Sequence, residues 1–102
     1  MYMYVMSKVV ENEMNKKDHH HIVAKKAPLA DPVRKILDKH GISVHDERNL
    51  VYVRKPLHWV LHTKQYYFIV NISVWAGDTF GGEEGVFFVL DCLSGVLGTK
   101  TK

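Results

Sequence analysis

Residues 57–75, LHWVLHTKQYYFIVNISVW, decide the fold, because their pattern fits both a helix and a pair of strands. On a helix, His58 and His62 stand one turn apart, as a metal-binding pair would. On a strand, the same two histidines lie about 13 Å apart on the outer face, too far to share one ion. Every second residue from Leu57 to Leu61 is apolar, which gives a strand a fully apolar inner row. The strand is therefore the favoured interpretation, and a metal site at His58 and His62 is the alternative.

A second predicted strand follows the polar connection at residues 63–65. Alternate residues from Tyr66 to Val74 are all apolar, which is typical of a strand with one dry face. The opposite row is mixed in character, and we expect it to be either a ligand pocket or a dimer surface. That row contains Tyr67, Ile69, Asn71 and Trp75.

The chain before this stretch changes its hydrophobic period from helical to extended. Residues 31–41 predict a short amphipathic helix, with Asp31 as N-cap, Pro32 at the first helical position and Gly41 as a left-handed C-cap. Residues 50–55 then alternate as a strand near the edge of a sheet. The glycine-rich residues 76–85 predict a loop, and two further strands are expected at 86–91 and 96–99.

The predicted fold is therefore α+β, with a helix packed on one face of a curved antiparallel sheet of four or five strands. Residues 1–21 are expected to form an N-terminal arm or helix, and residues 22–102 a single α+β domain. Four apolar residues at helical spacing favour the N-terminal helix. They are Met3, Met6, Val10 and Met14.

Composition limits the class of protein. With 102 residues, 46% of them hydrophobic and 25% charged, the chain has the make-up of a single globular domain. No apolar run is long enough to span a membrane, and Cys92 is the only cysteine, so a cytoplasmic location is expected. The net charge of +3 does not favour nucleic acid as a partner.

The sequence predicts no catalytic residues and no cofactor, because neither paired carboxylates nor an activated nucleophile is evident. Aromatic side chains beside acidic ones predict a surface for a protein partner instead. The residues of this predicted surface are Trp75, Asp78, Phe80, Glu83 and Glu84.

Several short motifs together resemble a known family. After the helix that ends at His40 and Gly41 come RKPLHWVL at 54–61 and KQYYFIV at 64–70. The glycine pair 81–82 precedes an aromatic strand, and LDCLSGVLG closes the chain at 90–98. This order resembles the small NTF2-fold immunity proteins, which share the cystatin-like plan of a helix laid across a curved sheet, and the ending is similar to that of PepSY-type domains.

The resemblance implies a non-enzymatic binding protein, an immunity-type antitoxin that neutralises a toxin. A toxin is then the expected protein partner, a homodimer is possible, and neither nucleic acid nor a membrane is expected as partner. The alternative is an NTF2-like protein with a pocket for a small ligand, or an enzyme on that fold, because one fold hosts many functions.

Overall fold

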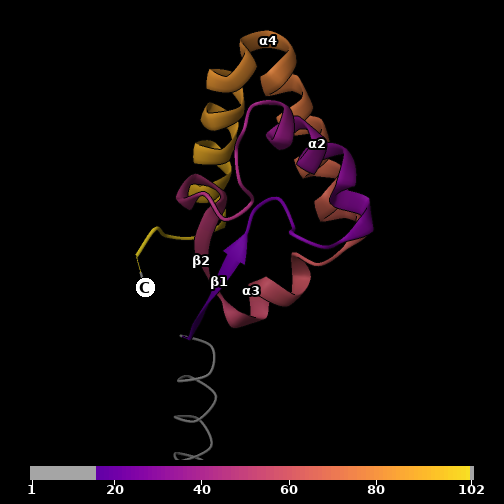
Figure 1. The fold of residues 1–102 in the computed structure, drawn as a ribbon. Coiled ribbons are helices and arrows are strands. Elements are labelled where there is room, and N and C mark those ends of the chain that lie inside the picture. The colour runs from indigo at the N-terminus through magenta and orange to yellow at the C-terminus, as the bar shows by residue number, and fades with distance from the viewer. Residues whose placement is uncertain (1–15, 102) are drawn as a thin grey trace, which may run out of the picture.

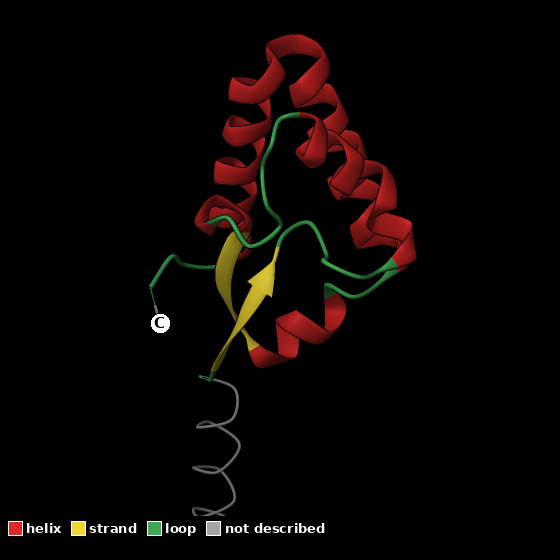
Figure 2. Ribbon diagram, viewed as in Figure 1, coloured by secondary structure: helices red, strands yellow, loops and turns green. Residues whose placement is uncertain are grey.

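The computed structural model describes residues 16–101, which form a two-stranded sheet and a set of helices (Figure 1). In chain order the elements are β1 (Lys17–His21), the 3₁₀ turn η1 (Pro28–Ala30), α2 (Asp31–Lys39), the 3₁₀ turn η2 (Glu47–Asn49), β2 (Leu50–Arg54), α3 (Lys55–Val60) and α4 (Lys64–Leu97). The α+β class is confirmed, although the sheet has two strands rather than four or five (Figure 2). The predicted N-terminal helix lies mostly outside the described residues.

The sheet is an antiparallel pair in which His20 of β1 lies opposite Val51 of β2. The strand predicted at residues 50–55 is β2, whose Val51 and Val53 alternate inward and are fully buried. The buried Asn49 fixes the chain just after β1 to the start of β2. Its side-chain oxygen accepts from the backbone N–H of Val23 at 2.8 Å, and its amide donates to the Val23 carbonyl at 3.1 Å.

Helix α2 follows the prediction closely. It begins at Asp31, so the predicted N-cap at Asp31 is wrong and Ala30 is the N-cap, whereas Gly41 has the left-handed φ of 69° that the predicted C-cap requires. Val33 and Leu37 form its buried stripe. The helix contacts α4, and so does strand β2 of the sheet.

The strand predicted at residues 57–62 is wrong, because α3 occupies most of it. Pro56 stands in the first turn of this helix, where the missing N–H costs nothing and the fixed φ is favourable. Trp59 is 72% exposed and does not form part of an inner row. Only Leu61, just after the helix, is buried.

The strand predicted at residues 66–75 is also wrong, because these residues form the first arm of α4. The Thr63 hydroxyl caps this arm by accepting from the Tyr66 N–H at 3.3 Å. The buried residues recur every fourth position, at Tyr66, Val70 and Val74, whereas Phe68 is 63% exposed. Because this stretch is apolar at both spacings, alternation alone could not separate the two structures.

Helix α4 doubles back at Gly82, as the arch at the top of Figure 1 shows. Gly82 has φ 58° and ψ −141°, a conformation that side-chain-bearing residues rarely adopt. Gly77 and Gly85 let the two arms touch, since a Cβ on Gly85 would lie only 1.9 Å from the Gly77 carbonyl oxygen. The predicted loop at residues 76–85 is therefore a helical bend.

The second arm of α4 replaces the strands predicted at 86–91 and 96–99. It buries Val86, Leu90 and Ser94, again every fourth residue. Only Thr99, beyond the helix, forms a single bridge with Tyr52 of β2.

One apolar core joins the sheet, α2 and both arms of α4. It consists of Ile22, Val23, Val33, Leu37, Ile42, Val51, Val53, Leu61, Tyr66, Val70, Val74, Val86 and Leu90. Among residues 16–101, no helix has both the length and the apolar character needed to cross a bilayer.

Candidate metal centre

Three histidines from β1 and the α3 segment come together at one end of the molecule. His20 lies in β1, His58 in α3, and His62 one turn further along the chain. One ring nitrogen from each lies within 4.8 Å of the others, close enough to hold one metal ion. The Nε2 atoms of His58 and His62 are 3.2 Å apart. This is the helical spacing of four that the sequence left as an alternative.

His20 is the most buried of the three, with 2% of its surface exposed. Burial, together with the neighbouring His58 and His62, lowers the pKa of His20 to about 3. Burial and His58 also lower the pKa of His62. These shifts favour the neutral form, which binds metals, at His20 and His62.

Each histidine of the cluster has an outer hydrogen-bond partner. His58 Nδ1 lies 3.0 Å from a carboxylate oxygen of Asp18, and because an ionised carboxylate only accepts, Nδ1 carries the proton and Nε2 is left with a lone pair. His20 Nε2 lies 2.9 Å from the hydroxyl of Tyr66. His62 Nδ1 lies 3.1 Å from the hydroxyl of Tyr67. Such outer partners fix the orientation of metal-binding imidazoles.

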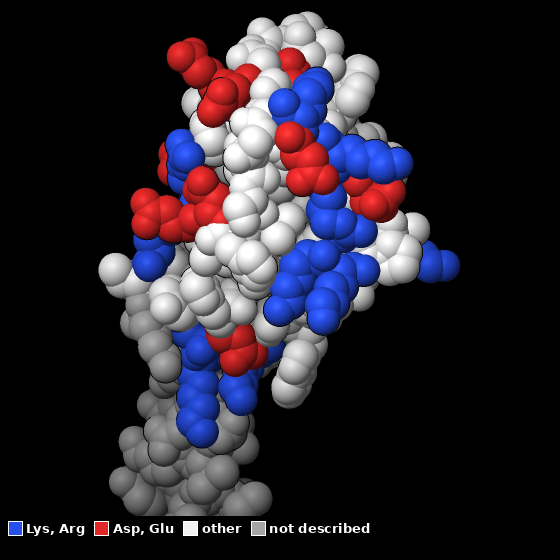
Figure 3. Space-filling model, in the orientation of Figure 1, with Lys and Arg blue, Asp and Glu red and all other residues white. Residues whose placement is uncertain are grey.

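The cluster opens into a cleft of about 350 Å³. The cleft is lined by His19, His20, His21, Ala24, Lys25, Lys26, Ala27, His58, His62 and Tyr67. Both lysines are exposed, so their ammonium groups face solvent at its edge. Figure 3 shows several Lys and Arg side chains close together on the visible face of the molecule. The cleft thus combines neutral nitrogen donors with positive charge.

His21 lines the same cleft but stands outside the three-histidine cluster. Its Nε2 lies 3.2 Å from Nδ1 of His45, and the two rings meet edge to face. Burial, followed by His45 and Lys25, lowers the pKa of His21. A neutral imidazole at this position is able to accept a proton.

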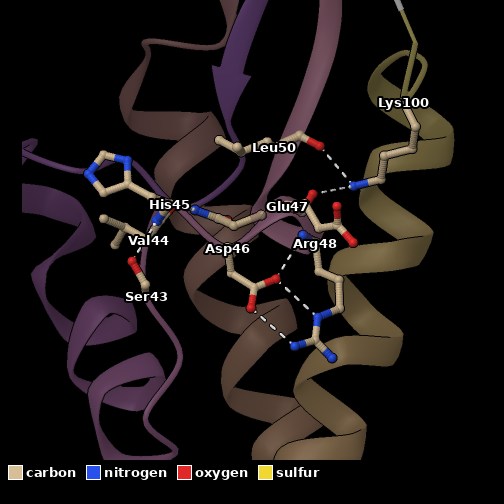
Figure 4. A network of polar contacts seen from close by, with 9 residues as sticks. Ser43, Val44, His45, Asp46, Glu47, Arg48, Leu50 and Lys100 are labelled. Carbon is tan, nitrogen blue, oxygen red and sulfur yellow. Dashed lines mark hydrogen bonds and ion pairs between the residues drawn. The ribbon is translucent and has the colours of Figure 1, made fainter.

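The loop that carries His45 is held by the polar network in Figure 4. Asp46 accepts from the backbone N–H of Arg48 at 2.9 Å and from its Nε at 3.0 Å. The Arg48 guanidinium lies 3.5 Å above the ring of Phe87 in α4. Lys100 donates to the carbonyl oxygens of Glu47 and Leu50 at 2.9 and 2.8 Å. The loop is therefore fastened to α4 and to the end of the described chain.

The residues predicted to form a pocket or dimer face do not lie on a sheet, because all four belong to α4. Tyr67 reaches the histidine cluster, whereas Ile69 and Trp75 are 56% and 58% exposed. Asn71 donates to the carbonyl of Leu29 at 2.9 Å. Sequence reasoning missed His20 as a third member of the cluster, although the run of three histidines at 19–21 was the signal that could have found it.

The residues of the predicted partner surface are spread along α4. Asp78 already has partners within the chain, because its two carboxylate oxygens pair with Lys39 at 2.5 Å and with His40 at 2.6 Å. Phe80 is 88% exposed, and Glu83 and Glu84 are exposed just after the bend. A partner at this surface stays a prediction.

Comparison with known families identifies the class of this protein. Residues 1–74 match the AHH family, a nuclease family of the HNH/ENDO VII superfamily with conserved AHH. The chain therefore belongs to the AHH family of nucleases. Neither a curated protein nor a solved structure matches it.

The Ala-His-His tripeptide after which the family is described does not occur in this chain. No alanine precedes two histidines here, and adjacent histidines occur only at 19–21. If the family's two histidines fall in this run, they are either His19 and His20, after Asp18, or His20 and His21, after His19. His20 is a member of the pair in either register, and it is the buried member of the metal cluster.

Family membership corrects the earlier functional interpretation. The resemblance to NTF2-fold immunity proteins is wrong, and so is the expectation of a non-enzymatic antitoxin, because the matched family is a nuclease family. The NTF2-like alternative has no support either. The motifs that carried the resemblance were glycines and aromatic residues interpreted as strands, and in the structure most of them lie in α3 and α4.

Proposed function

We propose that this protein is a metal-dependent nuclease that hydrolyses phosphodiester bonds at the cleft beside β1 and α3. The observation that carries the proposal is the convergence of His20, His58 and His62 within 4.8 Å in a chain of a nuclease family. The donor set suits a metal ion, because the nitrogens belong to imidazoles that are oriented by outer partners. Three imidazoles without a carboxylate among them favour a transition ion over Mg²⁺.

The residues around the cluster have separate roles in this proposal. His20, His58 and His62 hold the ion, which when bound would supply Lewis acidity toward a phosphate oxygen. His21, in the same cleft and outside the cluster, accepts the proton of the attacking water. His45 holds the ring of His21 from the outer side.

The substrate proposed is nucleic acid. Lys25 and Lys26 stand exposed at the cleft that the histidines line, where they attract a phosphate backbone. The sequence argued against nucleic acid because the net charge is only +3. Local charge beside the reacting site is what matters for a phosphodiester, and family membership is the reason to reverse that expectation.

The test is cleavage of labelled DNA and RNA oligonucleotides by the purified chain, without a histidine tag, in the presence of Zn²⁺, Ni²⁺, Co²⁺, Mn²⁺ or Mg²⁺. We expect cleavage with at least one transition ion, and its loss when a chelator is added. Intact DNA and RNA under every condition, with a folded protein that has bound its ion, would contradict the proposal.

A matched pair of variants separates the site from contaminating activity. His58→Gln removes one nitrogen donor from the cluster and should abolish cleavage. His40→Gln makes the same change at a histidine that pairs with Asp78 away from the cleft, and it should leave cleavage unchanged at a temperature where both variants are folded.

A further inference from the structure

The buried hydroxyl of Tyr66 lies between two groups that together determine where its proton goes. It lies 2.7 Å from the carbonyl oxygen of Ile22 and 2.9 Å from Nε2 of His20. A carbonyl only accepts, so the single hydroxyl proton of Tyr66 is donated to Ile22. A tyrosine hydroxyl keeps that proton at neutral pH, because its ordinary pKa is about 10.

The hydroxyl oxygen can then only accept from His20. This requires His20 to carry its proton on Nε2, because a neutral imidazole has one N–H and one lone pair. Its lone pair is consequently on Nδ1. Two of the three donor atoms of the cluster are thereby assigned, namely Nδ1 of His20 and Nε2 of His58, whose Nδ1 faces Asp18.

We propose that Tyr66 is a positioning residue of the metal centre, which fixes His20 as the Nε2–H tautomer and so presents Nδ1 to the ion. This rests on the metal site of the proposed function. Tyr66 lies in the first turn of α4, and its hydroxyl thus links that helix to the last residues of β1. Helix α4 supplies none of the three histidines, but through Tyr66 it determines the tautomer of His20.

The neighbouring Tyr67 offers a matched control. Its hydroxyl lies 3.1 Å from Nδ1 of His62, an exposed histidine. Among the hydrogen bonds of residues 16–101, this hydroxyl has no second partner that fixes its proton. It can therefore either donate to His62 or accept from it, and it selects no tautomer.

The experiment compares Tyr66→Phe with Tyr67→Phe. In metal-free protein, long-range ¹H–¹⁵N NMR spectra report the protonated nitrogen of His20, and we expect Nε2–H in the wild type and in Tyr67→Phe but a mixture of tautomers in Tyr66→Phe. Calorimetric titration with Zn²⁺ should show affinity weakened by about 10- to 100-fold in Tyr66→Phe. Tyr67→Phe also removes an outer partner and should weaken Zn²⁺ binding, but it should leave the Nε2–H signal of His20 unchanged, which separates the two variants.

The outcomes separate this inference from the proposed function. If the wild type binds none of the ions, the metal site fails, whereas the NMR spectrum still reports on Tyr66. If the wild type binds Zn²⁺ and Tyr66→Phe binds it equally well or more tightly, the inference is overturned. Should Tyr66→Phe fail to fold, the wild-type spectrum alone decides, since a proton on Nδ1 of His20 would overturn the assignment.

Discussion

The two ends of the molecule are built on different principles. At the end formed by β1, β2 and α3, polar side chains bond to one another between elements, as Asp18 does with His58. In α4, each arm buries every fourth residue and leaves large apolar side chains such as Phe68, Phe80 and Phe88 exposed. The histidine cluster, where we propose the chemistry to occur, lies at the strand and short-helix end. Helix α4 is mainly a support, and Tyr66 and Tyr67 are its contribution to the cluster.

The largest effect is expected from a substitution in the histidine cluster, measured as the rate of cleavage. Replacing His58 by alanine removes one nitrogen donor and the ring that meets His20 edge to face. We expect metal-dependent cleavage to fall by more than about 100-fold, the upper range for loss of an outer partner alone. Steady-state cleavage rates of a labelled oligonucleotide measure this effect. Phe80→Ala at the far bend of α4 should leave the rate unchanged, and a comparable loss there would remove the distinction between the two ends.

A core substitution should show what α4 contributes to stability. Leu90 is fully buried, so Leu90→Ala should lower the free energy of unfolding by about 2–5 kcal/mol through lost contacts and a cavity. Val96 is 82% exposed in the same arm, and Val96→Ala should change the free energy of unfolding by less than about 0.5 kcal/mol. Urea unfolding followed by circular dichroism compares the two variants. Equal effects would show that the second arm does not pack as described.

The bend between the arms gives an effect whose sign changes over one residue. Gly82→Ala should destabilise by about 1–3 kcal/mol, because alanine is strained at φ 58° and ψ −141°. Gly81 has open space around the position of a Cβ and no positive φ, so Gly81→Ala should stabilise by up to about 1 kcal/mol. The melting temperatures of the two variants should therefore move in opposite directions from that of the wild type.

The smallest effect concerns the contact between α2 and α4. Hydrogen bonds from Lys39 and then His40 hold the pKa of Asp78 below its ordinary value. A carboxyl whose pKa is lower in the folded state stabilises above its unfolded pKa of 3.8, and this contribution disappears as the pH falls through the folded pKa. Asp78→Asn should thus lower the melting temperature at pH 7 more than at pH 3. An equal shift at both pH values would show that the ion pairs do not contribute.

The sequence predicted the parts of the fold that carry local signals. Helix α2 was predicted from Asp31, Pro32 and Gly41, whose roles depend only on backbone geometry near the helix ends. Strand β2 was predicted from alternation that has no competing helical pattern. Both segments are short and have a single hydrophobic period, so the local pattern was sufficient.

Helix α4 could not be predicted in the same way, because its first arm is apolar at nearly every position. Tyr66, Phe68 and Val70 fit a strand as well as they fit a helix, and only packing against α2 and the sheet leaves Phe68 outside. The candidate metal site was not predicted, for a related reason. The spacing of His58 and His62 was recognised, but the strand interpretation separated the two residues, and His20 joins them only through tertiary structure.

The origin of the clustered histidines in separate segments has a consequence for the stability of the fold. His20 and His58 belong to segments far apart in the chain, so an ion bound by both would act as a removable cross-link between them. Because only the folded chain presents these donors together, an ion present at about 100 times its dissociation constant would add about 2.7 kcal/mol to the free energy of unfolding. Heat resistance of this nuclease should then rise and fall with the supply of the metal in its surroundings.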